Sequence, residues 1–573
     1  MPRYLVTSAL PYANGPLHFG HVAGAYLPAD VYVRTLRMLG EDVLYVCGSD
    51  EYGVAITISA ERAGQDYPEY VARWHRAIHD FFTALSIEFD VFSGTSTSEL
   101  HAPTALEFFR RLDENGYLQK QKSLQLYCPR DEMFLADRYV TGTCYVCGEG
   151  RARGDECPAC GTWIDVLRLI EPRCKVCGTR PDQRETTHWY LDMPKLRDEH
   201  IGRWIAEHPW KPNVKAFIAN MLEDVPLRPI TRDMKWGVQL PEELAQGERG
   251  KVLYVWFDAP IGYISFTKEY FAGRGEPERW KDYWKSADAR IVHFIGKDNI
   301  PHHCLLFPSM LFGVRDGYEL PWQVPANEFY NLQGAKFSTS GGWYIDLEEF
   351  FEKYDNEAAR FHILLSMPET ADAEFTWQGF QRTTNAALAG TIGNLATRVL
   401  KMVVKNFDGR VPPLFDEHVE ELDRVLLEEC GPVQDPAGEV RAFRFRPAAE
   451  ALVQNATVAN VFVDRLAPWT LVKTDARKAA SALNTLCEWI AHVARWMAPF
   501  MPRKAQELWE MLGQEGSVAR AGWPAPPRRG AWRGLSAGQP LGAVTGLFAR
   551  IDDATVAREV EALEARARAS RKS

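Results

Sequence analysis

The sequence lacks the features that would place the chain at a membrane or outside the cell. No apolar run reaches the ~18 residues that suggest a transmembrane helix. Residues 1–7 enter a strand-like run without the charged and apolar regions of a signal peptide. An excess of positive charge is also missing, because the formal net charge is -10. We therefore expect a cytoplasmic protein that is not a general nucleic-acid coat, although a local basic surface still allows an RNA partner.

Cysteine is sparse outside one segment. Of the eleven cysteines, four are isolated and seven fall between Cys128 and Cys177. In a chain without a secretory signal, clustered CxxC pairs indicate metal ligands rather than disulfides. One four-thiolate set suits a closed, tetrahedral, structural zinc site, the alternative being unligated thiols. Its members are Cys144, Cys147, Cys157 and Cys160, and each pair is followed by a glycine, Gly148 or Gly161.

A third pair, Cys174-x-x-Cys177, has Cys128-Pro-Arg-Asp131 upstream, with Asp131 where a fourth cysteine would stand. Because a carboxylate can ligate zinc, these residues form either a second, Cys₃Asp site or a knuckle that has lost its metal.

At 573 residues the chain is too long for one core, so we expect three or four units. Its first part has the pattern strand–helix–strand, over residues 4–8, 20–39 and 43–47, with Pro28 as a kink in the helix. Further strand-like runs cover residues 252–256 and 291–295.

From residue 385 onward the pattern is helical. Long runs of helix formers cover residues 386–404, 448–471 and 476–497. Residues 530–546 are less regular, and residues 554–572 are predicted to form a charged, solvated helix rather than a specific RNA arm.

His18-Phe19-Gly20-His21 is the first candidate phosphate-binding motif. Its histidines are three residues apart near the start of a helix that follows a strand, where helix N–H groups and imidazoles can donate to phosphate oxygens. Gly20 lets a nucleotide approach the backbone closely. Two unrelated surface histidines are the alternative.

Two further segments suit a nucleotide. Lys336-Phe337-Ser338-Thr339-Ser340 is a glycine-flanked run that can close over phosphates, although such runs are usually plain loops. Gly296-Lys297-Asp298 follows a predicted strand and places a carboxylate for a ribose hydroxyl.

Together, these motifs resemble the HIGH and KMSKS motifs of the class I aminoacyl-tRNA synthetases. The resemblance implies that His18, His21 and Lys336 stabilise the transition state. It implies an ATP site, with Mg²⁺, of His18, Gly20, His21, Gly296, Lys297, Asp298, Lys336, Ser338 and Thr339. Thr339 replaces the second lysine of the motif, and Gly341 is not basic. There are two alternatives: Lys297 or Lys336 neutralises more of the pyrophosphate, or activation is slow.

Within that class the chain is similar to the methionyl-tRNA synthetases. The similar strings are SALPYANG at residues 8–15, GSDEYG at 48–53 and VWFDAPIGY at 255–263. The resemblance implies a methionine pocket of aromatic rings, one carboxylate and one imidazole, whose aromatics suit a thioether. Its residues would be Leu10, Tyr12, Asp50, Trp256, Ala259, Pro260, Tyr263, Ile300 and His303. Without the resemblance, Trp256 would be interpreted as a core aromatic.

The helical part is similar to the anticodon-binding bundle of the same family at residues 393–398 and 467–469. Single-stranded loops are recognised by stacking bases on aromatic rings and by hydrogen bonds to base edges. The implied residues for a CAU anticodon are Asn394, Arg398, Pro468 and Trp469; a core position is the alternative for Trp469.

The expected fold is therefore α/β: a Rossmann-type catalytic domain in two halves (residues 1–120 and 246–330), separated by a zinc-knuckle insertion (121–245). A KMSKS-loop and stem-contact region (331–385), an α-helical anticodon-binding domain (386–548) and a charged tail (549–573) follow. The expected activity is ATP-dependent formation of methionyl-adenylate and transfer of methionine to the 3′ end of tRNA(Met), by a monomer. Other interpretations are a synthetase for another amino acid, a nucleotidylyltransferase and a tRNA-binding paralogue without catalysis.

Overall fold

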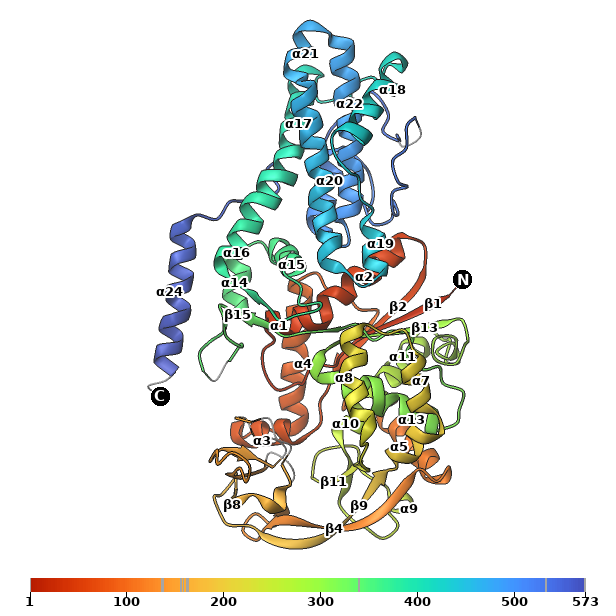
Figure 1. Cartoon of the computed structure of the whole chain (residues 1–573), viewed down its shortest axis with the longest axis vertical. Coiled ribbons are helices and arrows are strands. Elements are labelled where there is room, and N and C mark those ends of the chain that lie inside the picture. The colour runs from red at the N-terminus through yellow and green to blue at the C-terminus, as the bar shows by residue number, and fades with distance from the viewer. Residues whose placement is uncertain are drawn as a thin grey trace.

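The computed structural model describes residues 2–135, 139–154, 157, 159–160, 164–338, 341–530 and 533–570. Figure 1 shows an elongated molecule with a sheet-containing body in the middle, a ribbon of strands at one end and a helical bundle at the other. The termini are far apart in this view, and the last helix, α24 (Asp553–Ser570), lies beside the body rather than on the bundle.

The body contains a five-stranded parallel sheet of order β14-β13-β1-β2-β3. Its strands are β1 (Arg3–Ser8), β2 (Asp42–Ser49), β3 (Val91–Gly94), β13 (Ala289–Gly296) and β14 (Ala326–Asn327). The three strands predicted at residues 4–8, 43–47 and 291–295 are thus confirmed. The chain leaves β1 towards β2 and later returns to its other side as β13, which creates a crevice at the carboxyl ends of β1 and β13 where ligands bind in such sheets.

The helix predicted at residues 20–39 is confirmed, with a wide turn where the sequence predicts a kink. It consists of α1 (Phe19–His21), a π-helical turn η1 (Val22–Tyr26) and α2 (Leu27–Met38). Pro28 has no N–H to give to the carbonyl of Gly24. The side-chain amide of Asn327 donates to that oxygen and to the oxygen of Ala23 instead, at 3.1 Å each.

The strand predicted at residues 252–256 is only half correct. β12 (Lys251–Leu253) pairs with β11 (Thr231–Asp233), and the chain then turns into the short helix α10 (Val255–Asp258). A short apolar run does not distinguish strand from helix by periodicity. In the helical turn Val255 and Phe257 are buried while Trp256 stays 37% exposed.

The insertion is a long antiparallel ribbon of β4 (Leu118–Cys128) and β9 (Asp182–Leu191) with a small module at its tip. The module contains β5 (Met133–Phe134), β6 (Val140–Thr143), β7 (Ala152–Arg153) and β8 (Ile170–Cys174) around its own small core. After the ribbon come α6 (Met193–Leu196), α7 (Gly202–Glu207) and α8 (Pro212–Glu223), which return the chain to the body.

Beyond the sheet, β15 (Tyr330–Leu332) and β16 (Ala373–Phe375) pair in parallel around α14 (Leu347–Lys353) and α15 (Asn356–Leu365). The helical pattern predicted from residue 385 onward is confirmed. The elements are α16 (Trp377–Arg382), η8 (Thr383–Gly393), α17 (Asn394–Asn406), α18 (Asp416–Arg424), α19 (Pro436–Arg441), α20 (Phe445–Leu466), α21 (Pro468–Thr474), α22 (Ala476–Met497) and α23 (Pro502–Met511). The helix predicted over residues 448–471 is broken at Ala467, whose φ of 45° is left-handed.

The continuous helix Trp377–Asn406 is long and apolar enough to span a membrane by length and composition, contrary to the sequence-based expectation. Of its most apolar window, 44% is buried within the protein, and core helices of soluble proteins pass the same test. This feature alone is weak evidence for a membrane protein.

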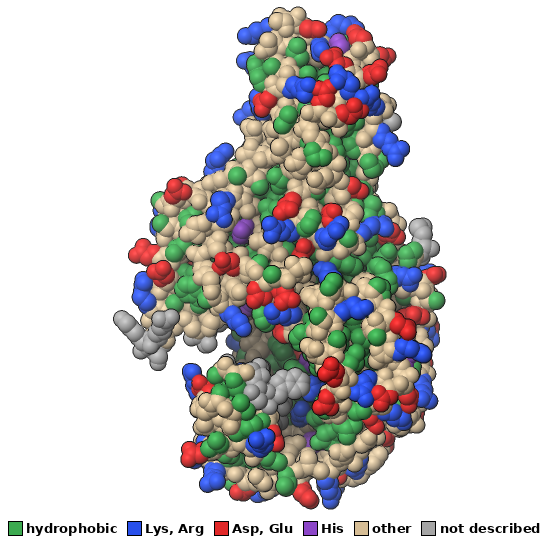
Figure 2. Space-filling model, viewed as in Figure 1, with side chains coloured by type: hydrophobic (Ala, Val, Ile, Leu, Met, Phe, Trp, Pro, Cys, Tyr) green, Lys and Arg blue, Asp and Glu red, His purple; other side chains and the backbone are tan. Residues whose placement is uncertain are grey.

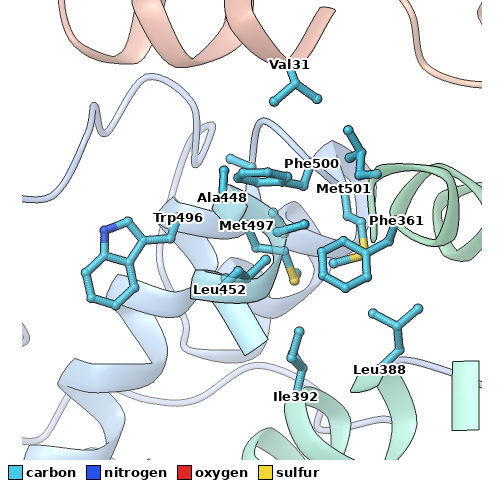
Figure 3. Close-up of a cluster of buried hydrophobic side chains, with 14 of the residues drawn as sticks. Val31, Phe361, Leu388, Ile392, Ala448, Leu452, Trp496, Met497, Phe500 and Met501 are labelled. Carbon is cyan, nitrogen blue, oxygen red and sulfur yellow. The ribbon is translucent and has the colours of Figure 1, made fainter. Parts of the chain in front are cut away.

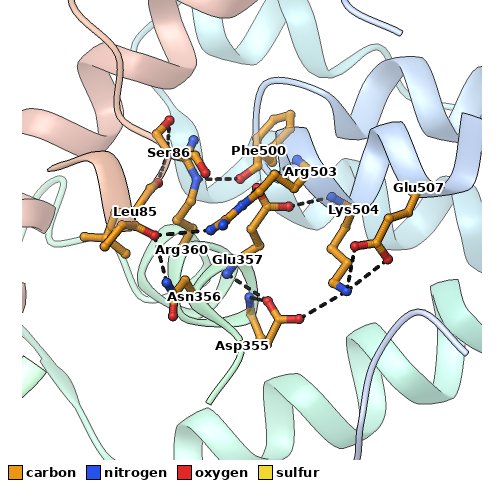
Figure 4. A network of polar contacts seen from close by, with 12 residues as sticks. Leu85, Ser86, Asp355, Asn356, Glu357, Arg360, Phe500, Arg503, Lys504 and Glu507 are labelled. Carbon is orange, nitrogen blue, oxygen red and sulfur yellow. Dashed lines mark hydrogen bonds and ion pairs between the residues drawn. The ribbon is translucent and has the colours of Figure 1, made fainter. Parts of the chain in front are cut away.

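Body and bundle share one hydrophobic core. Figure 3 shows Val31 of α2 and Phe361 of α15 near Leu452 of α20 and Met497 of α22. A polar joint lies at the same boundary (Figure 4). There the buried guanidinium of Arg360 donates to Asp30 at 2.6 Å and to the carbonyl oxygens of Leu85, Ser86, Pro499 and Phe500.

The prediction of a solvated terminal helix is wrong for one face of α24. Val556, Leu563 and Ala567 are buried, and the helix packs beside α16 and α14. Spacings of seven and four residues put these side chains on one stripe of the helix, with charged side chains elsewhere.

Candidate active site

His18 and His21 lie together at the start of α1, with ring centroids 3.8 Å apart. The backbone N–H of Gly20 donates to Nδ1 of His18, and the backbone N–H of His18 donates to Nδ1 of His21, both at 3.1 Å. A neutral imidazole has one protonated nitrogen, so these contacts assign the proton to Nε2 in both rings. Burial lowers the pKa of His18 to about 2. His21 is exposed at the edge of the cavity, yet desolvation by the surrounding protein lowers its pKa to about 4. At neutral pH the pair therefore offers two uncharged Nε2–H donors.

Glycine is the only residue type that fits at position 20, between the His18 ring and the backbone of β15. An added Cβ would lie 2.9 Å from the His18 ring and 3.0 Å from the carbonyl oxygen of Tyr330. Beside the motif lies a cavity of about 270 Å³ at the carboxyl ends of β1 and β13, the right size for a small ligand. Its lining includes His18, Gly20, His21, Gly296, Asp298 and Glu328. Burial raises the pKa of Asp298.

Lys297 does not line this cavity. Its Nζ pairs with Glu328 at 2.7 Å and Asp372 at 3.2 Å, and lies 4.1 Å from the ring centroid of Phe329. One expectation from the sequence is that Lys297 or Lys336 neutralises more of the pyrophosphate, because Thr339 replaces the usual lysine. Of these two, Lys297 is engaged by two carboxylates in this structure.

The described residues on either side of positions 339–340, Lys336–Ser338 and Gly341–Tyr344, are here called the Lys336 loop, and Phe337 lies against His18. The ring of Phe337 stacks on that of His18 with centroids 4.4 Å apart and planes 4° from parallel. Ser338 and Trp343 exchange two backbone hydrogen bonds of 2.9 Å, which close the loop, and Nζ of Lys336 lies 4.8 Å from the Phe329 ring. Thr339, also predicted to contact ATP, lies outside the described residues.

The residues predicted to bind methionine lie on the other side of the crevice. Tyr12 and Asp50 are backbone partners, and Nε1 of Trp256 donates to the Tyr12 hydroxyl at 3.2 Å. Burial, with Asp258 nearby, raises the pKa of Asp50 well above its usual range. Because Asp50 is enclosed by protein, a substrate ammonium is the counter-ion that would favour its charged form.

His303 and Tyr263 form a buried pair with a defined proton arrangement. Nδ1 of His303 lies 3.1 Å from the carbonyl oxygen of Asn299, which can only accept. Nε2 is therefore unprotonated and accepts from the Tyr263 hydroxyl at 2.9 Å. The same prediction includes four apolar residues: Leu10, Ala259, Pro260 and Ile300. Of these, Pro260 and Ile300 are buried, and an added Cβ on Gly262 would lie 3.1 Å from Leu10.

A larger cavity of about 470 Å³ opens beside Tyr12 and Trp256, between the insertion and the body. Figure 2 shows the hollow between the lobe of the insertion and the body. Arg228, Arg232 and Tyr254 line it, and the guanidinium of Arg232 lies 3.8 Å from the Tyr254 ring centroid. Sequence reasoning missed these residues; Arg228 and Arg232 lie in the short strands β10 (Arg228–Pro229) and β11, which were not predicted from the sequence.

Both predicted metal-ligand sets are assembled in the insertion. Within each set the ligand atoms of the four residues lie within 4.8 Å of one another, so both sets can hold a metal ion. The Sγ atoms of Cys144 and Cys160 are 3.9 Å apart, and those of Cys147 and Cys157 3.6 Å. Tetrahedral zinc at 2.3 Å from each sulfur requires roughly 3.8 Å between sulfurs.

The second set is equally compact. A carboxylate oxygen of Asp131 lies 3.2 Å from Sγ of Cys128 and 3.1 Å from Sγ of Cys174, and Sγ of Cys128 is 3.5 Å from that of Cys177. Asp131 thus occupies the position of a fourth ligand.

The residues predicted to contact the anticodon meet at the distal part of the bundle. Trp469 is 43% exposed, directly after buried Pro468. The Arg398 guanidinium lies 4.7 Å from the Trp469 ring centroid and pairs with Asp464 at 2.7 Å. Asn394, one turn before Arg398, donates to Asn460 at 3.4 Å. An exposed aromatic ring flanked by polar side chains suits a stacked base.

Comparison with known proteins agrees with this geometry. Residues 4–400 match the family described as tRNA synthetases class I (M), so the chain is a class I aminoacyl-tRNA synthetase. Residues 419–567 match the anticodon binding domain of methionyl tRNA ligase. The chain belongs to the methionine–tRNA ligase family.

Individual relatives cover nearly the whole chain. A methionine–tRNA ligase of Protochlamydia amoebophila is 43% identical over 565 residues, which cover 98% of this chain and 79% of the relative. One from Rubrobacter xylanophilus is 43% identical over 581 residues, covering 98% and 97%. Methionyl-tRNA synthetase of Mycobacterium tuberculosis, solved in complex with methionyl-adenylate, is similar with a TM-score of 0.74 at 26% identity, covering 96% of this chain and 100% of that one.

Proposed function

We propose that the chain activates L-methionine with ATP and transfers it to the 3′ end of tRNA(Met), for both initiation and elongation. The methionine carboxylate attacks the α-phosphorus of ATP, a P–O bond to pyrophosphate breaks, and methionyl-adenylate forms. A ribose hydroxyl of the tRNA end then attacks the methionyl carbonyl and AMP leaves. The paired Nε2–H donors of His18 and His21 beside the cavity at the ends of β1 and β13 are the observation that supports this most directly.

In the first step charge moves from the α-phosphate onto pyrophosphate. Two neutral donors fixed by backbone contacts can stabilise that charge without reorganising. Lys336 adds positive charge, Asp298 accepts a hydrogen bond from the ribose, and Mg²⁺ bound with ATP would neutralise phosphate oxygens. Gly20, Gly296 and Ser338 give the nucleotide close access to the backbone; Lys297 and Thr339 complete the proposed ATP set.

Methionine recognition rests on shape and on one charge. Asp50 pairs with the substrate ammonium, while the rings of Tyr12, Trp256 and Tyr263 pack on the thioether side chain. His303 is held as a hydrogen-bond acceptor by Tyr263, so the pair presents a polar edge beside Leu10, Ala259, Pro260 and Ile300. An apolar competitor such as leucine would leave that polar edge without a partner.

Zinc would be structural at both insertion sites. Four thiolates at Cys144, Cys147, Cys157 and Cys160 leave no open coordination position, and three thiolates with Asp131 also complete a tetrahedron. Each ion would stabilise a module whose own apolar core is small.

Trp469 would stack on a base of the CAU anticodon, with Asn394 and Arg398 facing base edges.

We place the enzyme in the cytoplasm as a monomer, with the six sequence segments named above as its domains. The test is to charge total tRNA with methionine and ATP and to sequence the charged species. Only tRNAs with a CAU anticodon should be charged; charging of another acceptor, or none, contradicts the proposal.

A further inference from the structure

Helix α24 follows the anticodon bundle in sequence but is docked against the body beside α14 and α16 (Figure 1). The Tyr354 hydroxyl at the end of α14 donates to Glu559 of α24 at 2.9 Å, and Nζ of Lys353 lies 3.5 Å from the same carboxylate. Leu563, one turn further, is buried among side chains of α14 and α16. The helix therefore has a defined seat on the body.

The segment that leads into α24 is fixed as well. The side chain of Asn385 both donates to the carbonyl oxygen and accepts from the N–H of Ile551, at 2.7 Å and 2.9 Å. Gln381, one turn earlier, donates to Asp553 at 2.7 Å. These contacts hold the first turn of α24 to the long helix that connects body and bundle.

The last turns of α24 reach the Lys336 loop itself. Nη1 of Arg566 donates to the carbonyl oxygen of Tyr344 at 2.8 Å, and its guanidinium lies 5.0 Å from the Tyr344 ring centroid. At Gly342, whose φ of +68° already favours glycine, an added Cβ would lie 2.6 Å from the Arg566 carbonyl oxygen and closer still to Oγ of Ser570. Helix and loop are thus packed backbone to backbone.

From Gly342 a short series of contacts leads to the ATP motif. Trp343 is paired with Ser338 by two backbone hydrogen bonds, and Phe337 stacks on His18. Lys336 is the residue before that ring. A shift at Gly342 or Tyr344 would therefore be passed through the Ser338–Trp343 pair to Phe337, and so to its stack on His18.

We propose that α24 is a positioning element for ATP activation, which holds the Lys336 loop from behind so that Lys336 and Phe337 stay in register with His18. This inference rests on the proposed function. It assigns Arg566 as the positioning residue that links helix and loop. The helix touches neither cavity of the crevice, so its effect is on the loop and not on methionine binding.

The test compares Arg566→Ala with Arg568→Ala in the full-length enzyme. Arg568 is a matched control because it is exposed on the same helix and its guanidinium pairs with Glu564 at 3.4 Å. In methionine-dependent ATP–pyrophosphate exchange, Arg566→Ala should lower kcat about tenfold, the effect of losing one charge-assisted hydrogen bond of about 1.4 kcal/mol. KM for methionine and the thermal midpoint should match the wild type, and Arg568→Ala should be unaffected.

Two further measurements separate positioning from general stability. Trypsin should cut after Lys336 faster in Arg566→Ala than in the wild type, and Arg566→Lys, which keeps one donor for Tyr344, should restore most of kcat. Removal of residues 552–573 should reproduce or exceed the loss. If Arg566→Ala has wild-type kcat, or if kcat and the thermal midpoint both fall while the methionine KM rises, the proposal is wrong. A wild-type enzyme without exchange would instead overturn the proposed function.

Discussion

Replacing Arg360 with methionine removes the centre of the joint between body and bundle. Its side chain is fully buried and donates to one carboxylate and four backbone oxygens from three separate segments. Removing one partner of a buried ion pair typically costs about 3–5 kcal/mol, because the other charge remains in the protein interior. In the variant Asp30 keeps its ion pair with Arg34 at 3.0 Å. We therefore expect the free energy of unfolding to fall by about 3 kcal/mol, near the lower end of that range.

The matched change is Arg503→Met at the edge of the same network (Figure 4). Arg503 is 57% exposed and lies 3.6 Å from Glu357, which also accepts from two backbone N–H groups of α23. An exposed pair contributes at most about 1 kcal/mol, so this variant should unfold nearly as the wild type does. Urea unfolding followed by tryptophan fluorescence measures the free energy of unfolding of both variants. Equal stability of the two variants would refute the assignment of Arg360 as the centre of the joint.

Three other predictions concern separate parts of the molecule. Trp469→Ala should lower kcat/KM for charging of tRNA(Met) at least tenfold while pyrophosphate exchange stays within twofold; equal loss of both would make Trp469 a structural residue. Metal analysis should find two zinc ions per chain and one in Asp131→Ala, and a wild type with a single zinc would limit binding to the four-cysteine set. His18 and His21 have pKa values lowered below their ordinary 6.5, so the unfolded chain binds more protons as pH falls. Stability should therefore drop as pH falls from about 6.5 towards 4, and His21→Asn should lose less between pH 7 and 5 than the wild type in urea titrations.

The local chemistry of this protein was predictable from its sequence. CxxC pairs, the HFGH string and the strand–helix–strand pattern have short-range spacing that their geometry requires, and the structure assembles all three. Asp131 is three residues after Cys128, as the CxxC spacing requires, and the structure brings this pair to Cys174, 43 residues further along the chain. Each of these motifs depends on a few residues that are close together in the sequence, so its local geometry can be predicted.

Features that depend on distant partners were not predictable. The contact of Arg360 with Asp30 joins residues 330 positions apart, and neither has a distinctive neighbour in the sequence. The pattern of α24 is that of a charged helix, and only its docking on α14 shows which face is buried. Val255 to Phe257 favour a strand by composition, yet β-pairing stops at Leu253 and the next turn is helical.

The central claim is that the crevice between β1 and β13 activates methionine with ATP. Exchange of labelled pyrophosphate into ATP, measured with each of the twenty amino acids in turn, tests it directly. The account predicts exchange with methionine, only marginal exchange with the others, and a loss of at least a hundredfold in His18→Ala, the cost of removing one preorganised donor. No exchange with methionine, or faster exchange with another amino acid, would contradict it.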